Sequence, residues 1–113
     1  FFTAYKTDRT ASREQTMLYY DEIIASAESS AESKAEAEAA KLDLAESMET
    51  ELVLEGLIKS LGFEDAIVTS TTENINVIVK CTELTGTQAS QILQLVMTET
   101  ETQATNVRII PTE

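Results

Sequence analysis

The stretch LEGLIKSLGFEDAIV, residues 54–68, contains the change from helix to strand that decides the fold. Up to Gly62 the apolar residues recur with helical spacing, and beyond it they alternate with the period of two that is typical of a strand. Gly62 stands where a helix needs a residue with positive φ to end, and Phe63 stands where the Schellman motif places an apolar contact, here with Ile58. The stretch therefore predicts a helix that ends at Gly62 and a strand that begins shortly after it.

Two adjacent carboxylates, Glu64 and Asp65, lie between that helix end and the strand. A catalytic pair is one interpretation, and a structural boundary is the other. Adjacent residues that enter a strand point to opposite faces of the sheet, so the two carboxylates cannot easily converge on one substrate atom. We therefore interpret the pair as a structural boundary.

Downstream of this stretch the sequence predicts a β-hairpin. Apolar residues alternate with other residues at 66–69 and again at 75–81, and a polar turn at 70–73 separates the two runs. The second run ends at Cys81, on the face that carries its valines. A buried or half-buried, inert thiol is expected there, because the chain has no histidine to activate it.

The C-terminal part of the chain predicts a helix and a short strand. Thr85 and Gln88 have the T-x-x-Q spacing of a capping box, and apolar residues at i, i+3, i+4 and i+7 extend the helix to near Glu101. Apolar residues then alternate at 107–110 in a last strand. Pro111 cannot donate a hydrogen bond to a sheet, so we expect the strand to stop there.

The first half of the chain predicts two helices, since it is rich in Ala, Glu, Ser and Lys. A break between them is expected within residues 25–34, where large apolar residues are absent, and a continuous helix is the alternative. Ser29 and Glu32 have the spacing of a capping box, so the second helix is expected from about residue 30 to residue 61. The first helix carries a narrow apolar stripe: Met17, Tyr20, Ile24, Ala27 and Ala31.

These elements predict an α+β fold with the order helix, helix, strand, strand, helix, strand. A chain of 113 residues is long enough to bury one core, so a single domain is expected. We expect residues 1–29 to form a projecting helix and residues 30–113 to form the body, a three-stranded sheet with the second and third helices packed on one face. The predicted core consists of ten apolar residues: Leu57, Ile58, Leu61, Val68, Val77, Val79, Ile92, Leu93, Val96 and Ile109.

The charge of the chain disfavours two classes of partner. Twenty acidic against eight basic residues give a net charge of −12, and the basic residues are scattered along the sequence. Binding to nucleic acid or to an anionic membrane surface is therefore not expected. No apolar run approaches the roughly 20 residues that a membrane-spanning helix needs.

The residue types also limit the chemistry. The chain has no histidine, one cysteine and three isolated glycines, which excludes Cys/His zinc sites, Ser-His-Asp triads and Gly-rich nucleotide-binding loops. No catalytic residue, metal site or cofactor is therefore expected. An enzyme or metal-binding domain that holds a hard cation with carboxylate oxygens alone is the alternative that stays open.

Two parts of the sequence are candidate protein-binding surfaces. Five of the six aromatic residues lie in the first twenty positions; they either pack the first helix onto the body or form a docking surface, since Tyr and Phe are enriched at interface centres. The last strand is expected at an edge of the sheet, where a partner strand can pair with its backbone. The predicted partner-binding residues are Tyr5, Tyr19, Tyr20, Val107, Arg108, Ile109 and Ile110.

Four segments together are similar to the stage III sporulation protein AH family. They are FTAYK at 2–6, LEGLIKSLGFEDAIV at 54–68, ENINVIVK at 73–80 and ASQILQLVMTET at 89–100, and the resemblance covers essentially the whole chain. The sequence departs from the family pattern in its acidic, Ala-rich residues 25–40 and in Cys81.

The resemblance implies a ring-building fold related to secretion-system ring proteins. It also implies a non-enzymatic role in the channel between mother cell and forespore during endospore formation. The implied partner is the LytM-like domain of stage II sporulation protein Q, with self-association into a ring and contact with other stage III channel proteins. The implied location is the space between the two membranes, with a transmembrane anchor in the mother-cell membrane upstream of this sequence.

Overall fold

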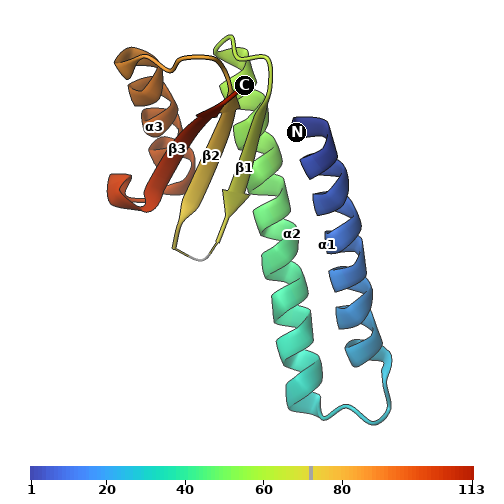
Figure 1. The fold of residues 1–113 in the computed structure, drawn as a ribbon. Coiled ribbons are helices and arrows are strands. Elements are labelled where there is room, and N and C mark those ends of the chain that lie inside the picture. The colour runs from blue at the N-terminus through green and yellow to red at the C-terminus, as the bar shows by residue number, and fades with distance from the viewer. Residues whose placement is uncertain (72) are drawn as a thin grey trace. The chain divides into compact units, whose positions relative to one another are not determined.

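The computed structural model describes residues 1–71 and 73–113. The predicted α+β fold and the predicted order of helices and strands are confirmed, with one short 3₁₀ helix added before the last strand (Figure 1). The chain divides into two compact units, Phe1–Glu46 and Ser47–Glu113, and the boundary falls inside the second helix. The elements are α1 (Phe2–Ala25), α2 (Ala31–Ser60), β1 (Ala66–Ser70), β2 (Ile75–Lys80), α3 (Gly86–Thr100), η1 (Ala104–Asn106) and β3 (Val107–Thr112).

The N-terminal unit contains α1 and the first part of α2. The chain leaves the helical conformation after Ala25, within the region where a break was expected. The Oγ of Ser30 accepts a hydrogen bond from the backbone N–H of Ser33 at 3.0 Å, so the cap of α2 lies one residue after the predicted Ser29. Lys41 of α2 forms an ion pair with Asp21 of α1.

The apolar stripe that was predicted for the first helix is shorter than expected. Met17, Tyr20 and Ile24 are half-buried in α1. Ala27 lies in the connection and is exposed, and Ala31 is the exposed first residue of α2. These two alanines were therefore wrongly included, because the helix ends before their positions.

In the C-terminal unit, β2 is the central strand of a three-stranded sheet (Figure 1). β1 pairs with β2 in the antiparallel direction, and β3 pairs with β2 in the parallel direction. The parallel pair is possible because α3 forms the crossover connection between β2 and β3. Both outer strands consequently have one side that is not paired with another strand.

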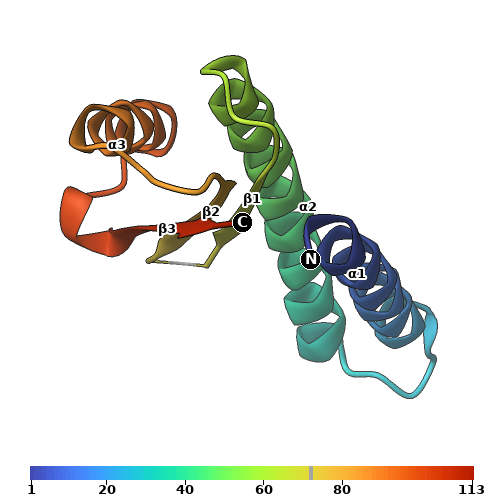
Figure 2. The ribbon, with the colours of Figure 1, turned by 45° about the horizontal axis from the view of Figure 1, so that its top comes forward.

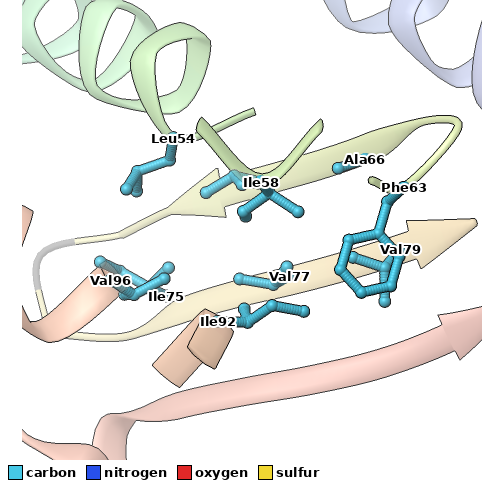
Figure 3. Packing of buried hydrophobic residues seen from close by; sticks show 10 residues of the cluster. Leu54, Ile58, Phe63, Ala66, Ile75, Val77, Val79, Ile92 and Val96 are labelled. Atoms are coloured by element: carbon cyan, nitrogen blue, oxygen red, sulfur yellow. The ribbon is translucent and has the colours of Figure 1, made fainter. Parts of the chain in front are cut away.

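The second and third helices cover one face of this sheet, as predicted (Figure 2). Leu54 and Ile58 of α2 and Ile92 and Val96 of α3 meet the inward side chains of β1 and β2 (Figure 3). Val68, Val77 and Val79 are inside, as predicted, and the burial of β2 alternates. The burial of β1 does not alternate, because Ile67 is also fully buried although it lies outside this cluster. The cluster also contains Phe63, Ala66 and Ile75.

Part of the predicted core is wrong. Leu61 is 41% exposed, because α2 ends at Ser60 and Leu61 lies in the turn that follows. Leu57, Leu93 and Ile109 are half-buried at the periphery.

The helix-to-strand change occurs at Gly62, whose φ of 112° confirms the predicted positive value. The last turn of α2 tightens, since the N–H groups of Leu61 and Gly62 donate to the carbonyls of Ile58 and Lys59 at 3.0 Å. Phe63 then enters the same buried cluster as Ile58, as expected. A Cβ atom added at Gly62 would have no neighbour within 4 Å, so the requirement for glycine there comes from the backbone conformation.

The hairpin turn, expected at residues 70–73, is closed by Thr71. Its backbone N–H donates to the carbonyl of Asn74 at 2.9 Å, and Asn74 N–H donates to the Thr71 Oγ1 at 3.2 Å. Thr72, which that prediction included, lies outside the described residues.

The capping box at the start of α3 is confirmed in both directions. The backbone N–H of Gln88 donates to Thr85 Oγ1 at 3.1 Å, and the backbone N–H of Thr85 donates to Gln88 Oε1 at 3.0 Å. The helix ends where it was expected to end, at Glu101, which has the left-handed φ of 58°.

The prediction that Pro111 ends the last strand is wrong, because β3 continues to Thr112. The backbone N–H of Cys81 donates to the carbonyl of Thr112 at 3.0 Å, so Thr112 faces β2. Neighbouring residues of a strand direct their backbone groups to opposite sides, and Pro111 therefore faces away from β2. The sheet needs no N–H at that position, so proline is tolerated.

Candidate functional site

The outer side of β3 is defined by the register of the sheet. Because Thr112 faces β2, so do the backbone groups of Ile110 and Arg108, two and four residues before it. The backbone groups of Val107, Ile109 and Pro111 consequently point away from the sheet. We call this outer side of β3 the β3 edge.

The β3 edge offers more acceptors than donors. The N–H of Val107 donates to the carbonyl of Ala104, the first residue of η1, and Pro111 has no N–H. The outward groups that remain are the N–H of Ile109 and the carbonyls of Val107, Ile109 and Pro111. Within the part of the chain that the structure describes, no acceptor is found for the Ile109 N–H. The edge is thus complementary to a strand that supplies several N–H donors.

The four predicted residues of this strand divide into two pairs. Val107 and Ile109 are half-buried and pack against the core, while their backbones face outward. Arg108 and Ile110 have exposed side chains on the sheet face opposite α2 and α3, while their backbones bond to β2. A strand added at the β3 edge would therefore use the backbone of the first pair and pass near the side chains of the second.

The outer side of β1, which we call the β1 edge, is arranged differently. The N–H of Val68 donates to Glu55 Oε2 at 2.9 Å, and the N–H of Ser70 donates to Glu51 Oε2 at 2.9 Å. The N–H of Ala66 donates to Asp65 Oδ1 at 2.8 Å. All three outward N–H groups of β1 are therefore bound by carboxylates of the same chain.

Glu51 and Glu55 are buried, with only 1% and 5% of their surface exposed. The sequence analysis did not predict their burial, because a glutamate is usually exposed to solvent unless it is paired. The signal was the series Glu51, Leu54, Glu55 and Ile58, which has the i, i+3, i+4, i+7 spacing of one buried helix face.

The predicted aromatic residues lie in the N-terminal unit and form two separate groups. Tyr5 is half-buried beside Phe1, with ring centroids 6.0 Å apart, and the Cζ atom of Arg9 lies 5.9 Å from the centre of its ring. The ring centroids of Tyr19 and Tyr20 are also 6.0 Å apart, and Tyr19 is 61% exposed. The helical rise places Tyr5 and Tyr19 about 21 Å apart along α1.

The carboxylates of Glu64 and Asp65 have separate structural contacts. Glu64 Oε1 lies 3.3 Å from Lys80 Nζ, and the Asp65 carboxylate caps the N–H of the next residue. These contacts agree with the interpretation of the pair as a structural boundary.

An acid-only metal site has little support in this geometry. Among the described residues, no group of three or more Asp, Glu, Cys or His is arranged to hold a metal ion. An open hollow of about 330 Å³ contains only two carboxylates, Glu73 and Glu99, among its lining residues. A hard cation usually takes more oxygen ligands than these two side chains provide.

No described helix has the length and apolar composition that crossing a membrane requires.

Comparisons with known proteins agree on one family. The family model described as SpoIIIAH-like protein matches residues 1–109. The stage III sporulation protein AH of Bacillus subtilis (strain 168) is 35% identical over 101 residues, which are 89% of this chain and 46% of that protein. The chain thus spans about half the length of the curated relative that it matches.

Two solved structures are similar to the structure of this chain. A chain in the structure of the SpoIIQ-SpoIIIAH pore forming complex has a TM-score of 0.81 and 30% identity, covering 98% of this chain and 97% of that chain. The type III secretion system protein EscJ of enteropathogenic E. coli has a TM-score of 0.58 and 17% identity, covering 65% of this chain and 50% of that chain. The second likeness shows a shared fold and confirms the expected relationship to a secretion-system protein at that level.

Proposed function

This chain belongs to the SpoIIIAH-like protein family, and from that premise we propose that it is a non-enzymatic structural component of the channel between mother cell and forespore. Its proposed partner is the LytM-like domain of a SpoIIQ protein, since the chain has the fold of a protein solved in a SpoIIQ-SpoIIIAH complex. Self-association into a ring and contact with other stage III channel proteins complete the proposal.

The proposed location is the space between the two membranes. An anchor in the mother-cell membrane, upstream of residue 1, would hold the domain there. The division at residue 30 into a projecting helix and a body is part of the same proposal.

The observation that carries the partner proposal is the β3 edge. Ile109 has an outward N–H, and three carbonyls beside it also point outward. Addition of a partner strand there satisfies these groups and extends the sheet, a common mode of peptide and protein recognition. The exposed Arg108 and Ile110 supply side-chain contacts on one face of the extended sheet.

A second contact is proposed on α1. Tyr19 is exposed and has the amphipathic ring that is enriched at interface centres. Tyr20 supports its ring, and Tyr5 belongs to a separate group near the start of the helix. An interface of ordinary size needs apolar anchors in addition to backbone pairing.

Substitutions at Ile109 test the edge with a matched pair of variants. Ile109→Pro and Ile109→Ala both remove the half-buried side chain, but only proline removes the outward N–H. Binding to the SpoIIQ LytM-like domain, measured by calorimetry, should be at least about fivefold weaker for the proline variant than for the alanine variant, because one backbone hydrogen bond is lost. Equal affinities of the two folded variants would contradict binding at the β3 edge.

Two further proline variants locate the effect. Val107→Pro removes an N–H that already donates to Ala104, so it should leave partner binding close to that of Val107→Ala. Arg108→Pro removes an N–H that faces β2, so it should weaken the sheet itself.

In the same calorimetric assay, Tyr19→Ala should lower the affinity for the partner without changing the melting temperature of the chain. An unchanged affinity would mean that Tyr19 of α1 is not part of the interface.

A further inference from the structure

The carboxylates of Glu51 and Glu55 occupy the position of a neighbouring strand beside β1. Residues four apart on a helix are separated by about 6.0 Å along its axis, and alternate residues of a strand are about 6.6–6.8 Å apart. This near match lets two successive turns of α2 serve two successive outward N–H groups, with Glu55 at Val68 and Glu51 at Ser70. The helix thus supplies the acceptors that another strand would supply.

This arrangement needs a reason, because burying a carboxylate is unfavourable unless it is well hydrogen-bonded. Both side chains are almost completely buried, and they are also one helical turn apart, where like charges repel. An apolar residue at either position would have avoided the charge but would have left a β1 N–H without an acceptor. Leaving the N–H groups open to water would have made β1 a second template for strand pairing.

We propose that Glu51 and Glu55 close the β1 edge to strand addition, so that the sheet can be extended only at β3. The identity of the strand that adds at β3 rests on the proposed function, but the closure of β1 does not. A chain with one open edge can pair with only one added strand. If that strand belongs to a second copy, both β3 edges are then occupied, so strand pairing between copies ends with two chains. Self-association into anything larger must then use surfaces other than the two edges of the sheet.

A double substitution opens the closed edge, and two others serve as controls. Glu51→Ala with Glu55→Ala removes both acceptors. Glu51→Gln with Glu55→Gln removes the charges but keeps an oxygen acceptor at each position. Glu46→Ala with Glu49→Ala makes the same change in net charge on exposed positions of the same helix.

Two measurements separate these variants. In the opened variant, amide hydrogen exchange at Val68 and Ser70 should be at least about tenfold faster, the factor expected for loss of a hydrogen bond to a charged acceptor. Sedimentation at rising concentration should show larger assemblies for this variant than for the unmodified chain and the two control variants. The exposed-site variant should keep the exchange rates and size of the unmodified chain. The glutamine variant should keep its size, with exchange rates between those of the unmodified chain and the opened variant, because its acceptors are neutral.

Several outcomes would overturn the proposal. A folded opened variant with unchanged exchange at both amides, or with the size of the controls at every concentration, would contradict closure. If the double variant is unfolded by circular dichroism, Glu51→Ala alone is measured at Ser70, with Val68 as the internal reference. In the unmodified chain, exchange at Val68 and Ser70 that is as fast as at Ile109 also contradicts it.

The proposed function fails separately, through the Ile109 pair of variants. That result would leave the exchange and sedimentation measurements of the β1 edge unaffected.

Discussion

Both edges of the sheet have backbone N–H groups that point outward, but these groups differ in whether they already have hydrogen-bond acceptors. At the β1 edge, the outward N–H groups of Val68 and Ser70 are bound by buried carboxylates of α2. At the β3 edge, the N–H of Ile109 points outward and no acceptor for it is found among the described residues. The two edges therefore differ in whether buried side chains of a packed helix accept their outward N–H groups.

The largest effect on the free energy of unfolding is expected when the carboxylate that binds the Val68 N–H is removed. Glu55→Ala leaves the N–H of the fully buried Val68 without an acceptor, so the free energy of unfolding should fall by about 2–3 kcal/mol. Glu49→Ala, on an exposed position of the same helix, should change it by less than about 0.5 kcal/mol. Urea denaturation of both variants checks this, and equal stabilities would mean that the Glu55 carboxylate is dispensable.

A smaller effect is expected at the turn that leads from α2 into β1. Gly62→Val places a β-branched residue at a φ of 112°, which should lower the free energy of unfolding by about 1–2 kcal/mol through backbone strain. No neighbour lies within 4 Å of a Cβ at this position, so crowding around the first side-chain atom does not contribute. Thermal denaturation gives the answer, and a variant that melts like the unmodified chain shows that this turn tolerates an ordinary residue.

The smallest effect is expected for a carboxylate that lies near β1 but is exposed. Glu64 is paired with Lys80 at 3.3 Å, and its side chain is 77% exposed. Glu64→Gln should therefore change the free energy of unfolding by no more than about 0.5 kcal/mol. A loss comparable with that of Glu55→Ala would show that burial is not what distinguishes the two carboxylates.

The local signals in the sequence predicted the framework of the fold. The end of α2 followed from Gly62, since few residues other than glycine adopt its φ. The start of α3 followed from Thr85 and Gln88, since a capping box depends on spacing within one turn. Such signals are visible in the sequence because the interacting groups are close along the chain.

The missed features depend on contacts between distant residues. Burial of Glu51 and Glu55 is favourable only because β1 has outward N–H groups beside α2. Their helical spacing indicates a buried face, but it does not indicate these hydrogen-bond partners. The direction in which Pro111 faces depends on the register between β2 and β3. For the candidate site, the sequence predicted the strand at the edge, but the register was needed to select Ile109 among its residues.

Amide hydrogen exchange at Val68, Ser70 and Ile109, with and without the SpoIIQ LytM-like domain, tests the difference between the edges most directly. In the free chain we expect slow exchange at Val68 and Ser70 and fast exchange at Ile109, because within residues 1–71 and 73–113 only the first two N–H groups have acceptors. Addition of the partner should slow exchange at Ile109 and leave the other two unchanged. Fast exchange at Val68 and Ser70 in the free chain, or an Ile109 rate that the bound partner does not alter, would contradict the account.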